Sequence, residues 1–225
     1  MTGIVFLNYN NRGHNAEVMQ SINQCRGDAE VLEVDMLGIA AATNYGLRYF
    51  FEEKKCDYVA VCANDIVLPP GWLNKMVHDA ERIPKTGINA IYCTLFLPEI
   101  QTVNGVQICP NWEVFGVSLY PRTTWEKVGY LNTAFDPYGV LDMDYCYRTT
   151  KAGLLNYYIA NLIANHIGLD TGEASEYRKM KDKGLQKSIN AFGKWQARYD
   201  SGQYYLPYEQ ETYLLEMNQM YGSAL

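Results

Sequence analysis

The segment that most constrains the fold is residues 56–72, with the sequence CDYVAVCANDIVLPPGW. Its apolar run, residues 58–63, is too short for a helix and is typical of a strand that is buried on both faces of a parallel sheet. The run ends at Asn64 and Asp65, and the Pro-Pro-Gly that follows stops any regular element. We therefore expect an open α/β sheet with a carboxylate at the carboxyl end of a central strand, where such sheets bind ligands. A simple turn also fits these two residues, because asparagine and aspartate commonly form turns.

The length and composition bound the class of protein. A chain of 225 residues can bury the core of one domain. An aromatic content of 13% and a charged content of 20% indicate a folded globular protein rather than a disordered one. The net charge of −6 argues against nucleic-acid binding over the whole surface, although a local basic patch is compatible with it.

Six cysteines occur without a Cys-x-x-Cys pair or any spacing typical of a zinc site. Cys62 and Cys93 lie inside apolar runs, which predicts reduced core residues. The first residues lack the basic and apolar regions of a signal peptide, and no apolar run reaches 18 residues. We therefore expect a cytoplasmic protein without a transmembrane segment, either bacterial or encoded by a virus and located in the host cytoplasm.

Residues 3–8 predict a first buried strand, followed by a polar loop at residues 9–13. A dinucleotide-binding Rossmann protein has Gly-x-Gly-x-x-Gly at this position, whereas this loop has one glycine. The sequence therefore disfavours that class of protein. Polar residues at a strand end need no function, so the loop by itself identifies no ligand.

The strand at residues 58–63, the Asn-Asp pair and the following Leu-Pro-Pro-Gly-Trp-Leu resemble the sugar-nucleotide segment of GT-A glycosyltransferases, especially the family 2 group. In that family the aspartate of a degenerate Asp-x-Asp motif holds a divalent cation against the donor's diphosphate. The resemblance assigns this role to Asp65, with Ala63 in place of the first aspartate. It implies an α/β fold of the GT-A type, with a Rossmann-like central mixed sheet flanked by helices over residues 1–170. Residues 171–225 are expected to be a C-terminal helical extension packed on the same domain.

The same resemblance predicts which residues bind the nucleotide-sugar donor. In the family a Tyr-Asn pair after the first strand contacts the base, an aspartate near the end of the second strand bonds it, and an asparagine lies on an alanine-rich helix. The donor-binding candidates in this chain are Asn8, Tyr9, Asn10, Asp35, Asn44 and Asn64. Residues 37–46 follow the second strand almost at once, whereas the family normally has one further strand in between. The nucleotide-binding half is therefore expected to be shortened.

A second group of polar residues lies in the run FDPYGVLDMDYCYR at residues 135–148. Asp142 and Asp144 are expected at the start of a helix, where the helix dipole favours carboxylates, so a structural role explains them. The run also resembles the family's Glu-Asp-x-Asp-hydrophobic-x-x-Arg block, in which the aspartate after the glutamate is the catalytic base. The resemblance assigns that role to Asp142, although Leu141 replaces the glutamate.

The acceptor side is expected to include the segment before this block. Residues 103–106, Val-Asn-Gly-Val, predict a hairpin turn, and residues 107–120 follow where the family commonly builds its acceptor pocket. The acceptor-binding candidates are Trp112, Asp144 and Arg148.

His166 follows the apolar run at residues 157–164. A single histidine is more often structural, but GT-A enzymes often place a metal-binding histidine after such a strand. The resemblance therefore adds His166 to Asp65 as a metal ligand. Oxygen ligands and a diphosphate indicate Mn²⁺ or Mg²⁺ rather than zinc, and imidazole suits Mn²⁺ better.

Lysine and arginine are concentrated in residues 178–198. Such a run is usually the solvated face of a helix. It could instead close over the donor diphosphate or meet an anionic acceptor. The tail at residues 199–225 has an amphipathic pattern that fits packing on the domain or formation of a homodimer.

The four motifs occur in family order across residues 3–170 and predict a metal-dependent, inverting glycosyltransferase that uses a nucleotide sugar, most simply a UDP-sugar. The acceptor is open among a glycan, a protein, a lipid-linked sugar and a modified nucleic-acid base. Two alternatives stand beside this prediction. A nucleotidyltransferase of similar fold usually has a Gly-rich signature with Arg or Lys after the first strand, which is absent here. A sugar-nucleotide or glycan-binding domain without catalysis is suggested by Ala63 and Leu141.

Overall fold

The computed structural model describes residues 1–8, 14–35, 38–93, 99–168 and 176–208. The strands are β1 (Thr2–Leu7), β2 (Glu30–Val34), β3 (Tyr58–Ala63), β4 (Ile66–Val67), β5 (Thr86–Tyr92), β6 (Gln101–Val103), β7 (Val106–Pro110), β8 (Val117–Pro121), β9 (Leu155–Ile163) and β10 (Asn165–His166). The helices are α1 (Asn15–Cys25), α2 (Ile39–Arg48), α3 (Trp72–Arg82), α4 (Arg122–Val128), α5 (Leu141–Lys151) and α6 (Glu176–Asp200), with a π-helical turn η1 (Tyr49–Glu53) and a 3-10 turn η2 (Thr133–Phe135).

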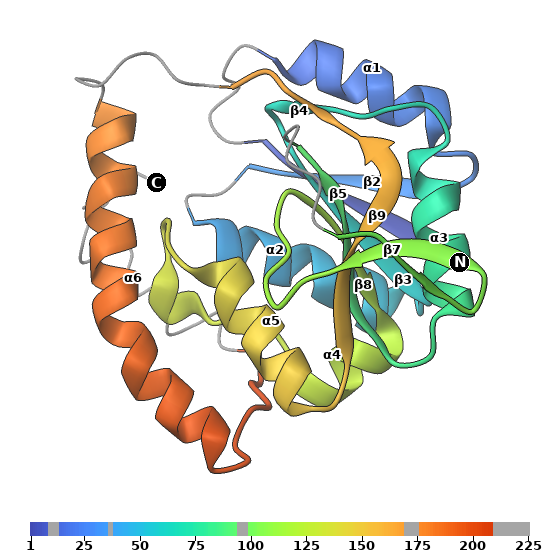
Figure 1. The fold of residues 1–225 in the computed structure, drawn as a ribbon. Helices are drawn as coiled ribbons and strands as arrows, with labels where there is room; N and C mark the ends of the chain where they lie inside the picture. Colours follow the sequence, from blue (N-terminus) through green and yellow to red (C-terminus); the bar gives the residue numbers. More distant parts are fainter. Residues whose placement is uncertain (9–13, 36–37, 94–98, 169–175, 209–225) are drawn as a thin grey trace.

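Eight strands form one mixed sheet in the order β2-β1-β3-β8-β5-β9-β7-β6, and helices flank it (Figure 1). The strands β1, β2 and β3 are parallel, whereas β8 runs antiparallel to both of its neighbours, β3 and β5. This is the mixed, helix-flanked α/β sheet expected from the sequence. The carboxyl ends of β1, β2 and β3 therefore meet at one edge, which is where ligands bind in open α/β sheets.

Both faces of the sheet are buried, because successive side chains of a strand point to opposite faces. On β1, Val5 packs in the core with α2 and α5, whereas Ile4 and Phe6 pack in the core with α1 and α3. Strand β3 alternates in the same way: Val59 and Val61 pack on the side of α2 and α5, and Ala60 and Cys62 pack on the side of α1 and α3. The short apolar runs are therefore strands with two buried faces, as predicted for residues 58–63.

Local signals also set the boundaries of elements. The turn between β6 and β7 has positive φ at Asn104 and Gly105 (50° and 78°), which confirms the hairpin predicted at Val-Asn-Gly-Val. The alanine-rich helix that carries Asn44 is α2, and the π-helical turn η1 follows it directly. The strand β5 ends at Tyr92, and residues 94–98 lie outside the described part.

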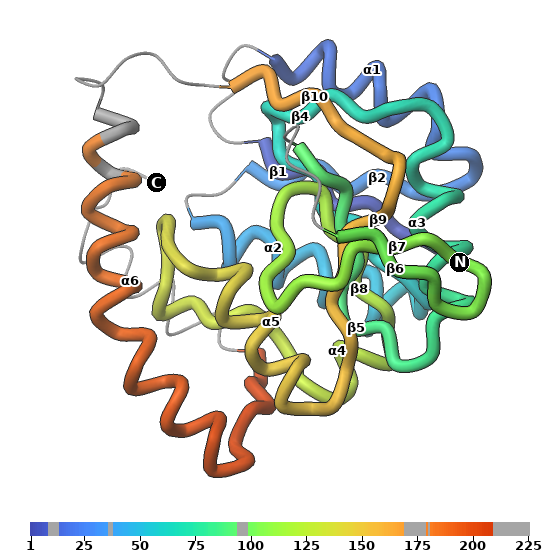
Figure 2. Tube along the Cα trace, viewed as in Figure 1, coloured from blue at the N-terminus to red at the C-terminus, as the bar shows by residue number. Residues whose placement is uncertain are grey.

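The helix α6 lies within the segment expected as a C-terminal extension and runs along one side of the molecule beside α5 (Figure 2). Its last turn is anchored because the Tyr199 hydroxyl donates to Asp144 Oδ1 at 2.7 Å. Ser188 on the same helix is buried against the loop after η2 and donates to the Phe135 carbonyl at 3.3 Å. Within the described residues, no helix combines the length and the apolar character that are needed to span a membrane.

Candidate functional site

A cavity of about 600 Å³ lies at the carboxyl ends of β1, β2 and β3. Its wall includes residues from the start of α2, the loop before β8, the start of α5 and the side of α6. Five of the predicted site residues line it: Asn8, Asn64, Asp65, Asp142 and His166. The fold thus brings together residues that are up to 158 positions apart in the sequence (166 − 8). Tyr9 and Asn10, which were also expected at the donor, lie outside the described residues.

Asp65 and His166 meet because two short strands hold them together. Strand β10 pairs antiparallel with β4, and the pairing puts His166 opposite Ile66. The backbone N–H of Ile167 also donates to the Asp65 carbonyl at 2.9 Å. As a result, His166 Nε2 lies 3.1 Å from Asp65 Oδ2, with side-chain exposures of 50% and 20%. The pair therefore faces the cavity and stays accessible to a ligand.

Asn8 and Asn64 are buried side chains in a chain of hydrogen-bonded groups below the cavity. The Asn8 amide donates to Glu33, and Asn15 Nδ2 donates to Asn8 Oδ1 at 2.6 Å. Asn64 Nδ2 then donates to Asn15 Oδ1 at 3.1 Å. Glu33 and Asn15 were not predicted as site residues, since no local motif marks them. They fix the side chains at the ends of β1 and β3, as buried polar groups require partners.

Asp142 lies in the first turn of α5 and faces the cavity with a partly buried side chain. Burial raises the pKa of Asp142 to about 7, and the negative charge of Glu113 contributes to that rise. A carboxylate that titrates near neutral pH is well suited to act as a general base. Glu113 lines the same cavity, although nothing in the sequence pattern marks it as a site residue.

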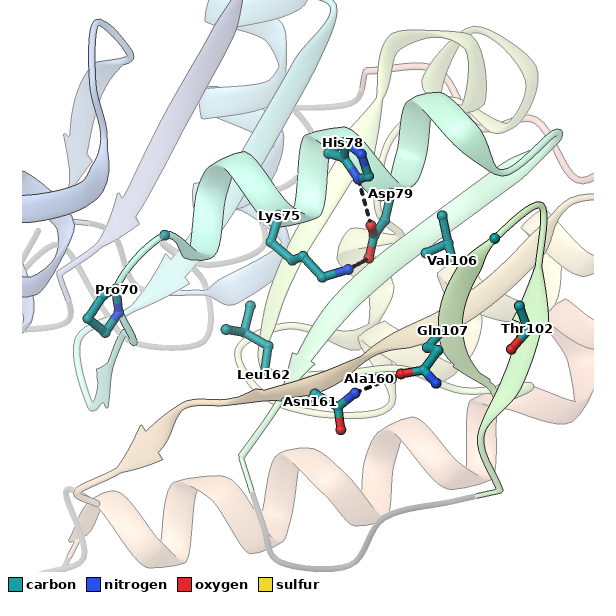
Figure 3. Close-up of a pocket in the computed structure, with 12 residues that line it drawn as sticks. Pro70, Lys75, His78, Asp79, Thr102, Val106, Gln107, Ala160, Asn161 and Leu162 are labelled. Carbon is teal, nitrogen blue, oxygen red and sulfur yellow. Dashed lines mark hydrogen bonds and ion pairs between the residues drawn. The ribbon is translucent and has the colours of Figure 1, made fainter.

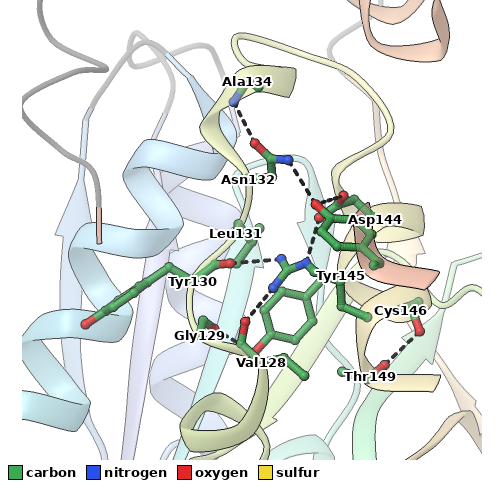
Figure 4. Close-up of polar contacts among 12 residues, drawn as sticks. Val128, Gly129, Tyr130, Leu131, Asn132, Ala134, Asp144, Tyr145, Cys146 and Thr149 are labelled. Atoms are coloured by element: carbon green, nitrogen blue, oxygen red, sulfur yellow. Dashed lines mark hydrogen bonds and ion pairs between the residues drawn. The ribbon is translucent and has the colours of Figure 1, made fainter. Parts of the chain in front are cut away.

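Asp144 and Arg148, two predicted acceptor ligands, form a buried ion pair instead (Figure 4). Arg148 Nε donates to Asp144 Oδ2 at 2.9 Å, and the two guanidinium NH groups donate to the carbonyls of Val128 and Tyr130 at 2.6 and 2.8 Å. Both side chains are essentially inaccessible and neither lines the cavity. Two positions along a helix turn the side chain by about 200°, so Asp144 points into the protein while Asp142 points to the cavity. This placement corrects the expected acceptor-binding role: the pair joins α5 to the end of α4.

Three other candidates also lie away from the cavity lining. Asn44 is buried; its Nδ2 donates to the Leu131 carbonyl at 2.9 Å, and the Leu131 N–H donates to its Oδ1 at 2.8 Å. These two bonds hold α2 to the segment after α4. Asp35 follows β2 and is exposed. Trp112 is 59% exposed on the loop that carries Glu113. The structure does not support a donor-binding role for the Asn44 side chain, because it is buried, bonds the backbone of Leu131 and does not line the cavity.

The loop over the cavity is fixed by Asp136. The backbone N–H groups of Ala40 and Ala41 donate to its two carboxylate oxygens at 2.8 and 3.0 Å. Helix α2 has no capping side chain of its own, so this distant carboxylate satisfies its first N–H groups. The contact holds residues 137–140, which line the cavity, beside the start of α2. It joins the two halves of the site.

The donor atoms of Asp65 and His166 fit a divalent cation only in part. A carboxylate oxygen and an imidazole nitrogen are ligands that Mn²⁺ accepts, and both belong to side chains that reach the cavity. In the ranges that the structure describes, no group of three or more His, Cys, Asp or Glu side chains could hold a metal ion. A cation here would therefore need oxygens from a ligand or water as well as these two residues.

A second cleft of about 660 Å³ lies between α3, the hairpin of β6 and β7, and the end of β9 (Figure 3). The fully buried carboxylate of Asp79 contacts Lys75 and lies 3.1 Å from His78 Nδ1. Asn161 Nδ2 donates to Gln107 Oε1 at 2.9 Å across the same cleft. The polar side chains of this cleft thus bond one another, and the cleft contains none of the predicted site residues.

Comparison with known proteins gives the fold a name. No protein-family model matches the sequence, and no curated protein matches it. Solved structures do match. GalNAc-T7 with UDP, GalNAc and Mn²⁺ has a TM-score of 0.61 at 10% identity, covering 91% of this chain and 58% of that one.

Two further structures have similar scores. A mannosyltransferase from Pyrobaculum calidifontis in complex with GDP-Man and Mn²⁺ has a TM-score of 0.54 at 14% identity, covering 74% of this chain and 56% of that one. Drosophila β1,4-galactosyltransferase 7 with manganese, UDP-Gal and xylobiose has a TM-score of 0.53 at 14% identity, covering 80% and 74%. This chain thus spans little more than half of the first two proteins. At these identities the likeness concerns the fold, and the chain has the fold of the GT-A glycosyltransferases.

Proposed function

We propose that this protein is an inverting glycosyltransferase that moves a sugar from a nucleotide donor, a UDP-sugar in the simplest case, to an acceptor hydroxyl. The observation that supports this most is that Asp65, His166 and Asp142 line the same cavity, which lies at the strand ends of a GT-A fold. These groups answer the two needs of the reaction, which are neutralisation of the leaving diphosphate and deprotonation of the acceptor.

The donor side consists of the strand-end residues. Asp65 and His166 would hold Mn²⁺ or Mg²⁺ together with the diphosphate, and the bound cation supplies positive charge that offsets the leaving phosphates. Lys181 of α6 also lines the cavity, with its ammonium group 4.6 Å from the centre of the Tyr138 ring. We assign it a supporting role toward the same phosphates. Asn8 and Asn64 line the donor side of the wall and are held by their amide chain.

The acceptor side depends on Asp142. Its carboxylate accepts the proton of the acceptor hydroxyl as that oxygen attacks the anomeric carbon. The new bond forms while the bond between the anomeric carbon and the phosphate oxygen breaks, and the nucleoside diphosphate leaves. Attack from the face opposite the leaving group inverts the configuration at the anomeric carbon.

The structural neighbours support a nucleotide-sugar donor. GalNAc-T7 is seen with UDP, the mannosyltransferase with GDP-Man and the galactosyltransferase with UDP-Gal, each with manganese. A second candidate is a sugar-nucleotide-binding protein without turnover. It is favoured by Ala63 at the position of the first motif aspartate and by the lack of a third metal-ligating side chain among the described residues.

The test begins with thermal unfolding of the protein in the presence of UDP-, GDP- and other nucleotide sugars, each with and without Mn²⁺. The donor that raises the melting temperature most in a metal-dependent way is then incubated with a panel of acceptors, and NMR of the product gives the anomeric configuration. A product of inverted configuration is expected. Stabilisation by a nucleotide sugar without hydrolysis or transfer would favour the binding protein, and no stabilisation by any of them would contradict both functions.

A further inference from the structure

The loop of residues 111–116 is fastened to the core from both sides. The Asn111 N–H donates to the Asn156 carbonyl at 3.1 Å, and the Phe115 N–H donates to the Tyr158 hydroxyl at 3.1 Å. Between them the Val114 N–H donates to Cys146 Sγ at 3.4 Å, and the Cys146 thiol donates to the Val114 carbonyl at 3.6 Å. Residue 113 is therefore held in a defined place.

That place is beside the proposed base. Cys146 and Asp142 are four positions apart on α5, so they lie on one face of the helix, one turn from each other. Because Val114 is tied to Cys146, the preceding residue, Glu113, lies next to the first turn of α5. Both Glu113 and Asp142 line the cavity, and the charge of Glu113 acts on Asp142.

Neither carboxylate is used by the fold. Among the described residues, Glu113 and Asp142 have no hydrogen-bond or ion-pair partner, and both side chains are partly buried. Carboxylates that lose part of their water and have no protein donor are open to O–H groups of a ligand. Two such groups side by side also disfavour an anion in the same place.

Exposed aromatic side chains flank Glu113. Phe115 is 47% exposed and lines the cavity, and its ring is held edge-on against Tyr158, with the ring centres 6.0 Å apart. Trp112 is 59% exposed. A sugar ring offers both kinds of surface, because its hydroxyl groups donate hydrogen bonds while its C–H groups pack on an aromatic ring.

We propose that Glu113 is a second acceptor-side carboxylate and that the acceptor is an uncharged sugar unit with neighbouring hydroxyl groups. Glu113 accepts a hydrogen bond from one hydroxyl and so positions the next one for Asp142. This inference rests on the proposed function and selects a glycan among the open acceptors. A phosphorylated sugar or a nucleic acid is disfavoured because its charge would meet the two carboxylates.

Glu113 also has an effect on the pH dependence. The other titratable groups coupled to Asp142 are Tyr120, Cys146 and Tyr158, and burial keeps them neutral by raising the pKa of each. Burial raises the pKa of Glu113 as well, and its carboxylate, once ionised, contributes to the raised pKa of Asp142, so its removal should lower the pKa of Asp142. The acid limb of the pH profile should move to lower pH in Glu113→Gln.

The test measures sugar binding directly, in the presence of UDP and Mn²⁺. The probes are methyl glycosides of common hexoses and their 6-phosphates, observed by saturation-transfer NMR and titrated by calorimetry. Wild-type protein should bind one or more neutral glycosides and should bind the matching 6-phosphates at least about tenfold more weakly. Glu113→Gln should weaken the neutral glycoside by about tenfold or more, the size expected for a lost charge-assisted hydrogen bond. Glu126→Gln, an exposed change on α4, should have no effect.

The outcomes separate the two proposals. Suppose that wild-type protein binds UDP but prefers the 6-phosphates or binds no neutral glycoside. The inference about the acceptor is then wrong while the donor site stands. The same holds if Glu113→Gln and Glu126→Gln change the affinity for the neutral glycoside equally. If wild-type protein binds no nucleoside diphosphate, UDP and GDP included, the proposed function itself fails. Unchanged UDP affinity in Glu113→Gln shows that the variant is folded. Once an acceptor that is glycosylated is known, the pH profile of transfer can be measured. An acid limb that does not shift in Glu113→Gln would also overturn the positioning role.

Discussion

The chain contains two pairs of an acidic and a basic residue that were expected at the site, and the structure uses them differently. Asp65 and His166 share one contact of 3.1 Å, and their side chains are 20% and 50% exposed at the cavity. Asp144 and Arg148 are at most 1% exposed; Tyr199 also donates to Asp144, and Arg148 also donates to two backbone carbonyls. A polar group whose hydrogen-bond partners all belong to the protein and which is closed to solvent holds the fold. A polar group that reaches a cavity with unfilled capacity is available to a ligand.

The largest expected effect is on the buried pair. Arg148→Ala leaves the Asp144 carboxylate buried without its counter-charge, and breaking such a pair typically costs about 3–5 kcal/mol of the free energy of unfolding. Urea unfolding measures this loss. Arg198→Ala on α6, which removes an exposed guanidinium stacked on Trp195, is the control and should cost about 1 kcal/mol or less. Similar small losses in both variants would show that the pair does not hold the fold.

The next effect separates the two acids of α5. Asp142→Asn keeps the shape of the side chain but cannot take a proton, so transfer should fall by about 10²–10⁴-fold, while the free energy of unfolding does not decrease. Asp144→Asn, in contrast, should mainly lower the free energy of unfolding. Initial rates and urea unfolding of both variants make the comparison. A loss of transfer confined to Asp144→Asn, in protein that is still folded, would move the base to Asp144.

A smaller effect is the pH dependence of stability. Burial raises the pKa of both Asp136 and Asp142 to about 7. Because these values lie above the usual value of about 4, protonation favours the folded state. The stabilisation is complete below about pH 4 and is lost as the pH rises through about 7.

Urea unfolding at a series of pH values checks this. The free energy of unfolding should fall between pH 4 and pH 8, and Asp142→Asn should reduce that fall by up to about 4 kcal/mol, the value for a shift of about three pKa units. Asp28→Asn, at an exposed position away from the cavity, should leave the dependence unchanged. An identical slope in wild-type protein and Asp142→Asn would contradict the raised pKa.

The sequence predicts the strands and the polar residues at their ends well. The strand β3 has the predicted bounds, and Asn64 and Asp65 lie at its end, because a strand buried on both faces is marked by its own residues. Asn8, which the family resemblance marked, lines the same cavity. Prediction of the α/β fold therefore needs mainly local patterns and the order of motifs.

The roles of other polar residues depend on contacts that no local pattern contains. Asn44 is used by the backbone of Leu131, which is 87 positions away. Arg148 finds two carbonyls 18 and 20 positions earlier, and this turns Asp144 inward. Glu113 reaches Asp142 only through the bonds between Val114 and Cys146. In each case the role of a polar residue is decided by a partner that is distant in the sequence.

The proposed donor site binds a nucleoside diphosphate through Asp65 and His166. Calorimetric titration with UDP, first with Mn²⁺ and then with EDTA, measures this binding. Affinity should rise with Mn²⁺ in wild-type protein and in the control variants Asp28→Ala and His78→Ala, which change residues outside the cavity lining. The gain should be lost in Asp65→Ala and reduced in His166→Ala. Equal affinity for UDP with Mn²⁺ and with EDTA, or a gain that persists in Asp65→Ala, would contradict the account.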